Sequence, residues 1–163
     1  MERKRGFEIA KGFENCNINL PIRKTARSAA YDLEAAEDGD TIQLAAETYT
    51  LPTTIAKSLT IKGVEGTVLM ANEVTVTDLA IEDCKILFKN GTYSSGNMFY
   101  AAAALKSFTL KNCVVGDADH KFQNVLRNGG FAEGATLSFE GCKFSHFGQF
   151  FVMIANAANI ARI

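Results

Sequence analysis

The residues best suited to chemistry lie in one polar segment, GDADHKFQN, which runs from Gly116 to Asn124. It contains Asp117, Asp119 and His120, and the chain has one other histidine, His146. Carboxylates beside an imidazole can bind a cation or act on a sugar by proton transfer. A solvated turn is the simpler interpretation, and His146, in the aromatic stretch KFSHFGQFF, is better explained as packed at a turn. We take Asp119 and His120 as candidate ligand-binding residues.

A second pair of candidates comes from two similar segments, NMFYA from Asn97 and NVLRN from Asn124. If both are strands with Phe99 and Leu126 facing inward, alternation predicts these outward residues: Met98, Tyr100, Val125 and Arg127. Tyr100 can stack on a sugar ring, and Arg127 can hydrogen-bond to a hydroxyl or a carboxylate. Ordinary surface positions are again the simpler interpretation of Tyr100 and Arg127.

A repeat predicts the elements that position these residues. LAIEDCKI starts at Leu79 and returns at equal spacing, as FTLKNCVV from Phe108 and as LSFEGCKF from Leu137. An imperfect copy, LTIKGVEG, starts at Leu59. Apolar and polar residues alternate within each copy, which predicts a strand with one buried face. Residue types that accept a positive φ precede the cysteine position and predict a one-residue bend: Asp83, Asn112, Gly141 and, in the first copy, Gly63.

Copies that recur at such intervals predict coils stacked about 4.8 Å apart, with like residues in columns. NMFYA, NVLRN and FFVMI provide a third strand for each coil. The predicted fold is an all-β solenoid, a short parallel β-helix of about five coils. Thr25 is a suitable N-cap for an amphipathic helix over residues 25–38 that caps one end. Residues 1–24 then form an extension with one coil-like strand, and residues 25–163 form the β-helix domain.

The four cysteines show no metal-binding spacing. Cys16, Cys84, Cys113 and Cys142 are far apart in the sequence and include no C-x-x-C pair. Three of them occupy the same position of the repeat, so we predict small buried side chains stacked in one interior column. Disulfides between neighbouring copies stay open as an alternative, because stacked residues lie near the required Cα separation. We predict no metal, no cofactor and no catalytic residue.

The segment DGDTIQLAAETYTL (Asp38–Leu51), followed by SLTIKG (Ser58–Gly63), resembles the start of right-handed parallel β-helix proteins of the pectin-lyase-like class. The NC and GC steps of the repeat resemble their asparagine-turn coils. The likeness is greatest to uncharacterised secreted bacterial β-helix domains that handle polysaccharides. Glu47 departs from the glycine usual before Thr-Tyr, and the enzymes of the class commonly have many more coils. The resemblance implies a right-handed helix with three strands per coil and a secreted or cell-surface location.

Lyases of this class resemble one another in a groove of acidic calcium ligands with a basic residue that acts as base. Glycoside hydrolases need two opposed carboxylates. The candidate face lacks an acidic cluster, and nothing in the spacing pairs Glu133 with Glu140. We therefore predict a non-catalytic carbohydrate-binding or structural β-helix module of a secreted or cell-surface protein. The alternative is a polysaccharide lyase or glycoside hydrolase, or a fragment of one.

The composition and the ends of the chain indicate which binding partners to expect. The chain has 17 Lys and Arg against 18 Asp and Glu, which disfavours a nucleic-acid partner. No apolar run approaches the roughly 20 residues of a membrane span, and no signal peptide follows MERKR. Polysaccharide is the expected partner. The coil-like segment Gly12–Asn19 and an uncapped strand from Ile160 also predict a homo-oligomer, formed through the C-terminal coil edge or the N-terminal strand.

Overall fold

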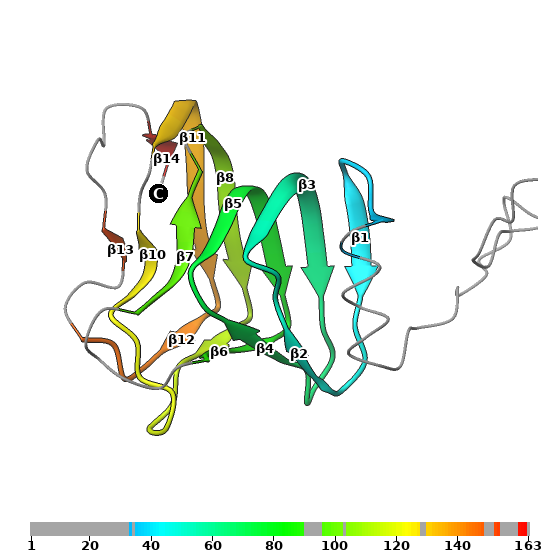
Figure 1. Cartoon of the computed structure of the whole chain (residues 1–163), viewed down its shortest axis with the longest axis vertical. Helices are drawn as coiled ribbons and strands as arrows, with labels where there is room; N and C mark the ends of the chain where they lie inside the picture. The colour runs from blue at the N-terminus through cyan, green and yellow to red at the C-terminus, as the bar shows by residue number, and fades with distance from the viewer. Residues whose placement is uncertain are drawn as a thin grey trace, which may run out of the picture.

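The computed structural model describes residue 33 and residues 35–89, 96–102, 104–127, 130–148, 152–153 and 160–162. These residues form an all-β fold in which every recorded strand pair is parallel (Figure 1). Leu33 and Ala35 are helical; Leu33 packs against the core, and the neighbouring Ala36 is buried. Residues 36–38 are not helical, so the helix ends before residue 38, where the prediction placed its end. The remaining residues of the predicted capping helix, and the strand predicted within residues 1–24, lie outside the described residues.

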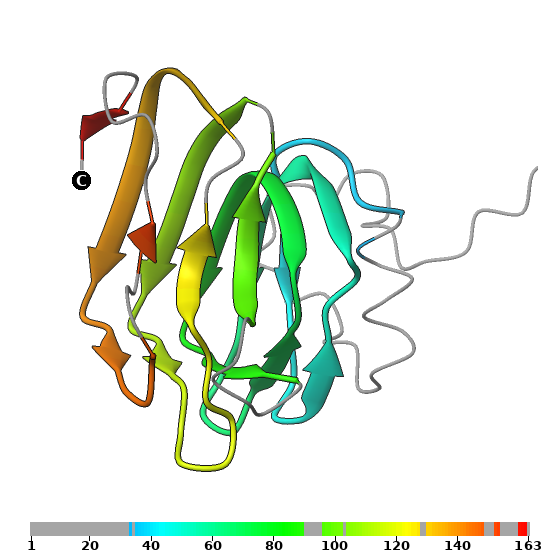
Figure 2. The same ribbon diagram turned by 60° about the vertical axis from the view of Figure 1, so that its left-hand side comes forward.

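The strands form two sheets. The nine-stranded sheet contains β1 (Asp40–Gln43), β3 (Thr54–Lys62), β5 (Val74–Glu82), β7 (Asn97–Ala101), β8 (Leu105–Lys111), β10 (Asn124–Arg127), β11 (Phe131–Glu140), β13 (Val152–Met153) and β14 (Ile160–Arg162). The five-stranded sheet contains β2 (Thr48–Thr50), β4 (Val68–Ala71), β6 (Lys85–Phe88), β9 (Val114–Val115) and β12 (Lys143–Phe144), in the order β12-β9-β6-β4-β2. Figure 2 shows the long strands β3, β5, β8 and β11 side by side, from teal β3 to orange β11.

The copies of the repeat pair with one another in the predicted register. Leu59 of β3 lies opposite Leu79 of β5, which lies opposite Phe108 of β8, which lies opposite Leu137 of β11. The last three are completely buried, and Leu59 is 4% exposed. Each strand therefore satisfies its backbone hydrogen bonds with the equivalent strand of a neighbouring copy, while its inward side chains stack into a shared core.

The bends after these strands follow the prediction in three copies and differ in one. Asp83, Asn112 and Gly141 have positive φ values of 55°, 52° and 62°. Gly63 is not among the residues with positive φ. A Cβ at Gly63 would lie 2.7 Å from both the carbonyl oxygen of Asp83 and the Sγ of Cys84. Close packing against the next copy, rather than an unusual backbone conformation, is therefore what favours glycine at this position.

The cysteines of the repeat stack inward as predicted. Cys84 and Cys113 are buried, Cys142 is partly buried, and all three are free thiols. The Sγ of Cys84 donates a hydrogen bond to the carbonyl of Glu82 at 3.1 Å, and the Sγ of Cys142 donates to the carbonyl of Leu110 at 3.3 Å. The alternative of disulfides between these three residues is therefore not what the structure shows.

Charged residues of alternating sign line the outer face of the same strands. Lys62, Glu82, Lys111 and Glu140 occupy one register position in four successive strands. Lys62 Nζ lies 3.2 Å from Glu82 Oε2, and Lys111 Nζ lies 3.7 Å from Glu140 Oε1. We call these four residues the charge ladder. Because a slip of one residue would destroy the alternation of charge, the charge ladder favours the observed register.

The segments predicted as third strands contain strands, but the burial of their side chains differs from expectation. NMFYA forms β7 and NVLR forms β10, and FFVMI contributes β13. Met98 and Val125, which alternation assigned to the surface, are both completely buried. Both faces of these strands are covered at Met98 and Val125, and alternation alone cannot distinguish a solvated face from a covered one.

The predicted strand at the C-terminal end is present. β14 pairs with β11 through Ala135↔Ile160 and Thr136↔Arg162. Self-association through this edge or through the N-terminal strand stays a prediction. In the part of the chain that the structure describes, no helix is long and apolar enough to cross a membrane.

Buried thiols should be chemically inert in the folded protein. In a variant with Cys16→Ala and Cys142→Ala, only Cys84 and Cys113 are left to react. Burial raises the pKa of Cys84 to about 12 and that of Cys113 to about 11, so almost no thiolate exists near neutral pH. Ellman's reagent should label both thiols in denaturant and neither in native buffer. Rapid native labelling of both would contradict the interior cysteine column.

The charge ladder can be tested by reversing its signs. Glu82→Lys places three lysines in adjacent strands, and repulsion should lower the free energy of unfolding by roughly 1 kcal/mol at low salt. The matched control reverses all four residues, with Lys62→Glu, Glu82→Lys, Lys111→Glu and Glu140→Lys, and should restore most of the loss at unchanged net charge. Urea unfolding at low and high salt measures both effects. Equal stability of the single and fourfold variants would argue against the ladder.

Candidate functional site

A hollow of about 350 Å³ lies on the outer surface where the chain passes from one sheet to the other. Its apolar walls are Val64, Val68 and Val114, and we call it the valine hollow. Three large apolar side chains are exposed among the described residues, and two of them, Val64 at 39% and Val114 at 44%, line this hollow. Apolar side chains kept in contact with water beside polar groups are typical of a binding surface.

A tight turn forms one wall of the valine hollow. Gly66 has a positive φ of 92°, and Thr67 is buried. The hydroxyl of Thr67 donates to the carbonyl of Ala45 at 2.9 Å and accepts from the amide of Val64 at 2.9 Å. The bond to Ala45 attaches the turn to the preceding copy, and the bond from Val64 closes the turn on itself. The position of Val64 is therefore set by the stack and not by the turn alone.

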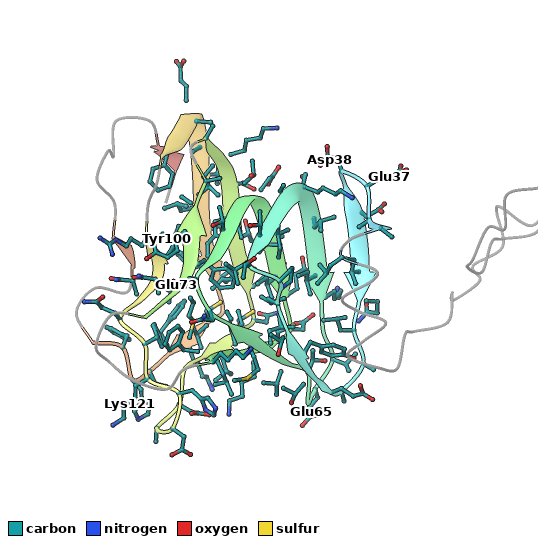
Figure 3. All side chains as sticks on the ribbon, viewed as in Figure 1. Glu37, Asp38, Glu65, Glu73, Tyr100 and Lys121 are labelled. Carbon is teal, nitrogen blue, oxygen red and sulfur yellow. The ribbon has the colours of Figure 1, made fainter. Side chains whose placement is uncertain are left out.

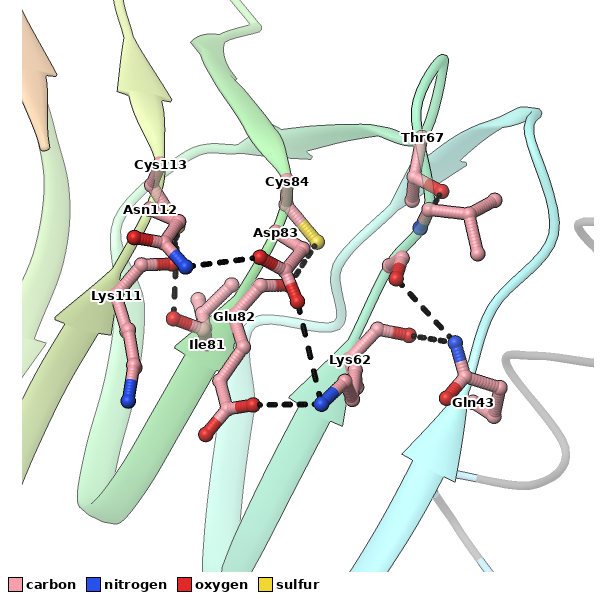
Figure 4. A network of polar contacts seen from close by, with 12 residues as sticks. Gln43, Lys62, Thr67, Ile81, Glu82, Asp83, Cys84, Lys111, Asn112 and Cys113 are labelled. Carbon is pink, nitrogen blue, oxygen red and sulfur yellow. Dashed lines mark hydrogen bonds and ion pairs between the residues drawn. The ribbon is translucent and has the colours of Figure 1, made fainter. Parts of the chain in front are cut away.

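The bend residues contribute polar groups to the valine hollow. Asn112 Nδ2 donates to Asp83 Oδ1 at 3.2 Å, and Lys62 Nζ lies 4.0 Å from Asp83 Oδ2 (Figure 4). The side chains of Asp83 and Asn112 project at the bends because a residue with positive φ interrupts the alternation of the strands. The side chain of Asp83 is 39% exposed, so its carboxylate can still accept hydrogen bonds from a ligand.

Lys85 connects the valine hollow to the polar segment that begins at Gly116. It lines the hollow, and its Nζ donates to Asp117 Oδ2 at 2.8 Å. The other carboxylate oxygen, Asp117 Oδ1, lies 2.8 Å from His120 Nδ1. This oxygen also accepts from the backbone amides of Asp119 and His120, at 3.1 and 3.0 Å. Lys85, Asp117 and His120 therefore form one continuous polar chain.

The electrostatics of Asp117 follow from these contacts. Partial burial by itself raises the pKa of this carboxyl, but the hydrogen bonds from Lys85, His120 and the amide of Asp119 outweigh it. The net result is a pKa well below the usual range, so Asp117 is a carboxylate at every pH near neutrality. A permanent carboxylate at Nδ1 favours the tautomer with a proton on that nitrogen, which leaves Nε2 of His120 as an acceptor.

The sequence candidates do not form one site. Tyr100 and Arg127 lie opposite each other in β7 and β10, as their place in the repeat implied. The hydroxyl of Tyr100 accepts from Asn97 Nδ2 at 2.9 Å, and Arg127 is exposed. Asp119 and His120 lie in the loop before β10, and Tyr100 is well separated in Figure 3 from Lys121, the residue after His120. Ligand binding by each pair stays a prediction.

Sequence reasoning missed three residues of the candidate site. Asp83 and Asn112 were recognised as bend residues, and Lys85 as a polar position of the repeat, but none was assigned to a site. The contact of Lys85 with Asp117, which is distant in the sequence, depends on the stacking of β6 and β9. The spacing of Asp117 and His120 in a polar turn was the one local feature of the sequence that indicated the site. Within the described residues, no three His, Cys, Asp or Glu side chains are grouped so that they could hold a metal ion.

The contacts of Asp117 predict a pH-dependent contribution to stability. Because its pKa is lowered in the folded state, this contribution is full above the unfolded value of about 4 and is lost as the pH falls further. Asp117→Asn should therefore lower the free energy of unfolding at pH 7, and its difference from wild type should shrink below about pH 4. Asp119→Asn, which retains the backbone amide, is the control and should show little change. A difference for Asp117→Asn that does not vary with pH would be inconsistent with the ion pair.

Comparison with known proteins gives a limited similarity. No protein-family model and no solved structure matches the chain. The deoxyuridine 5'-triphosphate nucleotidohydrolase of Lactococcus lactis subsp. lactis (strain IL1403) is 54% identical over 33 residues, which are 20% of this chain and 22% of that enzyme. The chain thus matches about a fifth of this relative's length.

This similarity is to a nucleotide-hydrolysing enzyme and to no carbohydrate-binding protein. It overturns the prediction of a carbohydrate-binding or structural module. The secreted or cell-surface location stays a prediction. The alternative of a polysaccharide lyase or glycoside hydrolase is overturned on the same ground. The repeat had indicated how the chain is arranged, and the assignment to polysaccharides followed from resemblance of fold, which does not determine function.

Proposed function

We propose that this protein binds a nucleotide, with the base in the valine hollow and the phosphates toward Lys85. The observation that carries the proposal is the position of Lys85, at the edge of an exposed apolar hollow. The partial similarity to an enzyme named for deoxyuridine 5'-triphosphate supports the class of ligand.

The chemistry of the valine hollow suits a flat heterocycle. Val64, Val68 and Val114 offer apolar contacts to the faces of a base, which water solvates poorly. Asp83 accepts hydrogen bonds, and Asn112 can both donate and accept them, so their side chains can contact the polar edge of a base. A volume of about 350 Å³ is at the small end of ligand sites, which suits a nucleoside better than a long polymer.

Charged side chains of both signs line the valine hollow. Asp83 and Glu65 would repel phosphate, whereas the ammonium group of Lys85 attracts it. Lys85 keeps its contact with Asp117 on the side that leads to the polar segment. A nucleotide therefore has one favourable orientation, with its phosphates at Lys85 and its base at the bends.

We further propose that the parallel stack is a short right-handed β-helix with three strands per coil, of the pectin-lyase-like class. The in-register pairing of successive copies of the repeat, together with the successive pairing of β2, β4, β6, β9 and β12, supports it. In this arrangement two successive coils each contribute a bend residue and an outward residue of the five-stranded sheet to the valine hollow. These residues are Asp83 with Lys85 and Asn112 with Val114. A crystal structure with the opposite hand of connection would contradict this proposal.

Isothermal titration calorimetry with dUTP and with deoxyuridine tests nucleotide binding. Wild-type protein should bind both ligands. Lys85→Met should weaken dUTP binding about tenfold, because a charge-assisted contact is lost, and should leave deoxyuridine binding nearly unchanged. Val114→Asp, which places a carboxylate in an apolar wall, should weaken both.

Lys143→Met is the matched control for Lys85. Lys85 and Lys143 both lie opposite Val114 in the register, on either side of it, but Lys143 does not line the valine hollow. The control should bind dUTP like wild type. Absence of dUTP binding at millimolar concentration would refute the proposal, and so would equal losses for Lys85→Met and Lys143→Met.

A further inference from the structure

We propose that His120 is a general base, oriented by Asp117, that activates water to hydrolyse a phosphoanhydride of the bound nucleotide. The identity of the substrate rests on the proposed nucleotide binding. The role of His120 rests on its own geometry and on its connection to Lys85 through Asp117.

The contacts of Asp117 orient the imidazole. Asp117 Oδ1 lies 2.8 Å from His120 Nδ1 and accepts a hydrogen bond from the backbone amide of His120 at 3.0 Å. One carboxylate oxygen therefore holds both the side chain and the backbone of His120. Its second oxygen is occupied by Lys85 at 2.8 Å, which limits rotation of the carboxylate. The side chain of His120 is 31% exposed, and its Nε2 is the nitrogen left to accept a proton from water.

The loop that holds His120 is anchored at both ends. At its start, the amide of Gly116 donates to the carbonyl of Ile86 at 2.9 Å, and Gly116 has a φ of 80°. A Cβ there would lie 2.2 Å from the carbonyl oxygen of Ser145 and 2.6 Å from the ring of Phe122, so the packing admits only glycine. At its end, Phe122 is completely buried and contacts the ring of Phe147. A histidine on a loop fixed in this way is pre-organised for proton transfer.

The reaction is balanced without a further reactant. The water oxygen forms a bond to phosphorus, and one water proton passes to Nε2 of His120. The phosphoanhydride P–O bond breaks, and the leaving phosphate or pyrophosphate takes the electron pair. His120 then returns its proton to solvent. The negative charge of Asp117 stabilises the imidazolium that forms, and Lys85 offsets charge on the phosphate side.

The test measures release of phosphate and pyrophosphate from dUTP, with bis(p-nitrophenyl) phosphate as a second substrate that needs no base recognition. His120→Gln should lower both rates at least about 100-fold. The wild-type rate should rise with pH to a plateau, because only a neutral imidazole accepts a proton, and the rise should disappear in His120→Gln. His146→Gln is the matched control, because it changes the other histidine, which is not part of the polar chain of Lys85, Asp117 and His120. This variant should keep the wild-type rate.

Asp117 is a positioning residue, and its test separates orientation from folding. Asp117→Asn retains an oxygen but can present an N–H to the imidazole, which favours the opposite tautomer. Nitrogen-15 NMR should report the Nδ1–H tautomer in wild type and a shift toward Nε2–H in the variant, with a loss of hydrolysis. A purely structural role would change the unfolding midpoint without changing the tautomer or the pH profile.

The outcomes distinguish this inference from nucleotide binding. Binding of dUTP without hydrolysis of either substrate overturns the general-base role and leaves the proposed function standing. Hydrolysis of the small diester that depends on His120, without any nucleotide binding, supports the general base and overturns the proposed function. Equal rates for wild type and His120→Gln on both substrates refute the inference, whatever calorimetry shows.

Discussion

In-register parallel stacking is the constraint on which the other features of this protein depend. Each strand finds its hydrogen-bond partners in the equivalent strand of a neighbouring copy, so a strand taken alone would leave its backbone groups unpaired. Stacking also puts like side chains in contact and buries the column formed by Leu79, Phe108 and Leu137. The charge ladder and the bends restrict the same register from outside the core, so several weak preferences agree on one arrangement.

The candidate site is a consequence of this stacking. The bends place Asp83 beside Asn112, and the pairing of β6 with β9 places Lys85 beside Asp117. The site combines groups from successive copies, because residues that are outward at equivalent positions become neighbours about 4.8 Å apart. The repeat is thereby a means of bringing together polar groups that are distant in the chain, and its irregular loop, with Asp117 and His120, adds chemistry that the regular copies lack.

Two further errors of interpretation, besides the bend predicted at Gly63, have separate physical origins. Alternation placed Met98 and Val125 on the surface, yet both are buried, because a period of two specifies opposite faces and not which face meets solvent. Polysaccharide handling was inferred from resemblance of fold, and the partial similarity to a nucleotide hydrolase contradicts it. A stacked β fold restricts where side chains lie but leaves the chemistry of its outer surface to a few residues, which is why resemblance of fold misled.

The sequence by itself determined the all-β class, the spacing of the copies, the inward cysteines and three of the four bends. These features depend on the period of two and on residue types that accept a positive φ, and both are local properties. Only the tertiary structure decided that close packing requires glycine at Gly63 and that Met98 and Val125 are buried. It also decided that Lys85 contacts Asp117. These outcomes depend on which side chains and backbone groups lie close to one another across neighbouring strands and loops. The distances between those groups are set by the stacking of all the strands together.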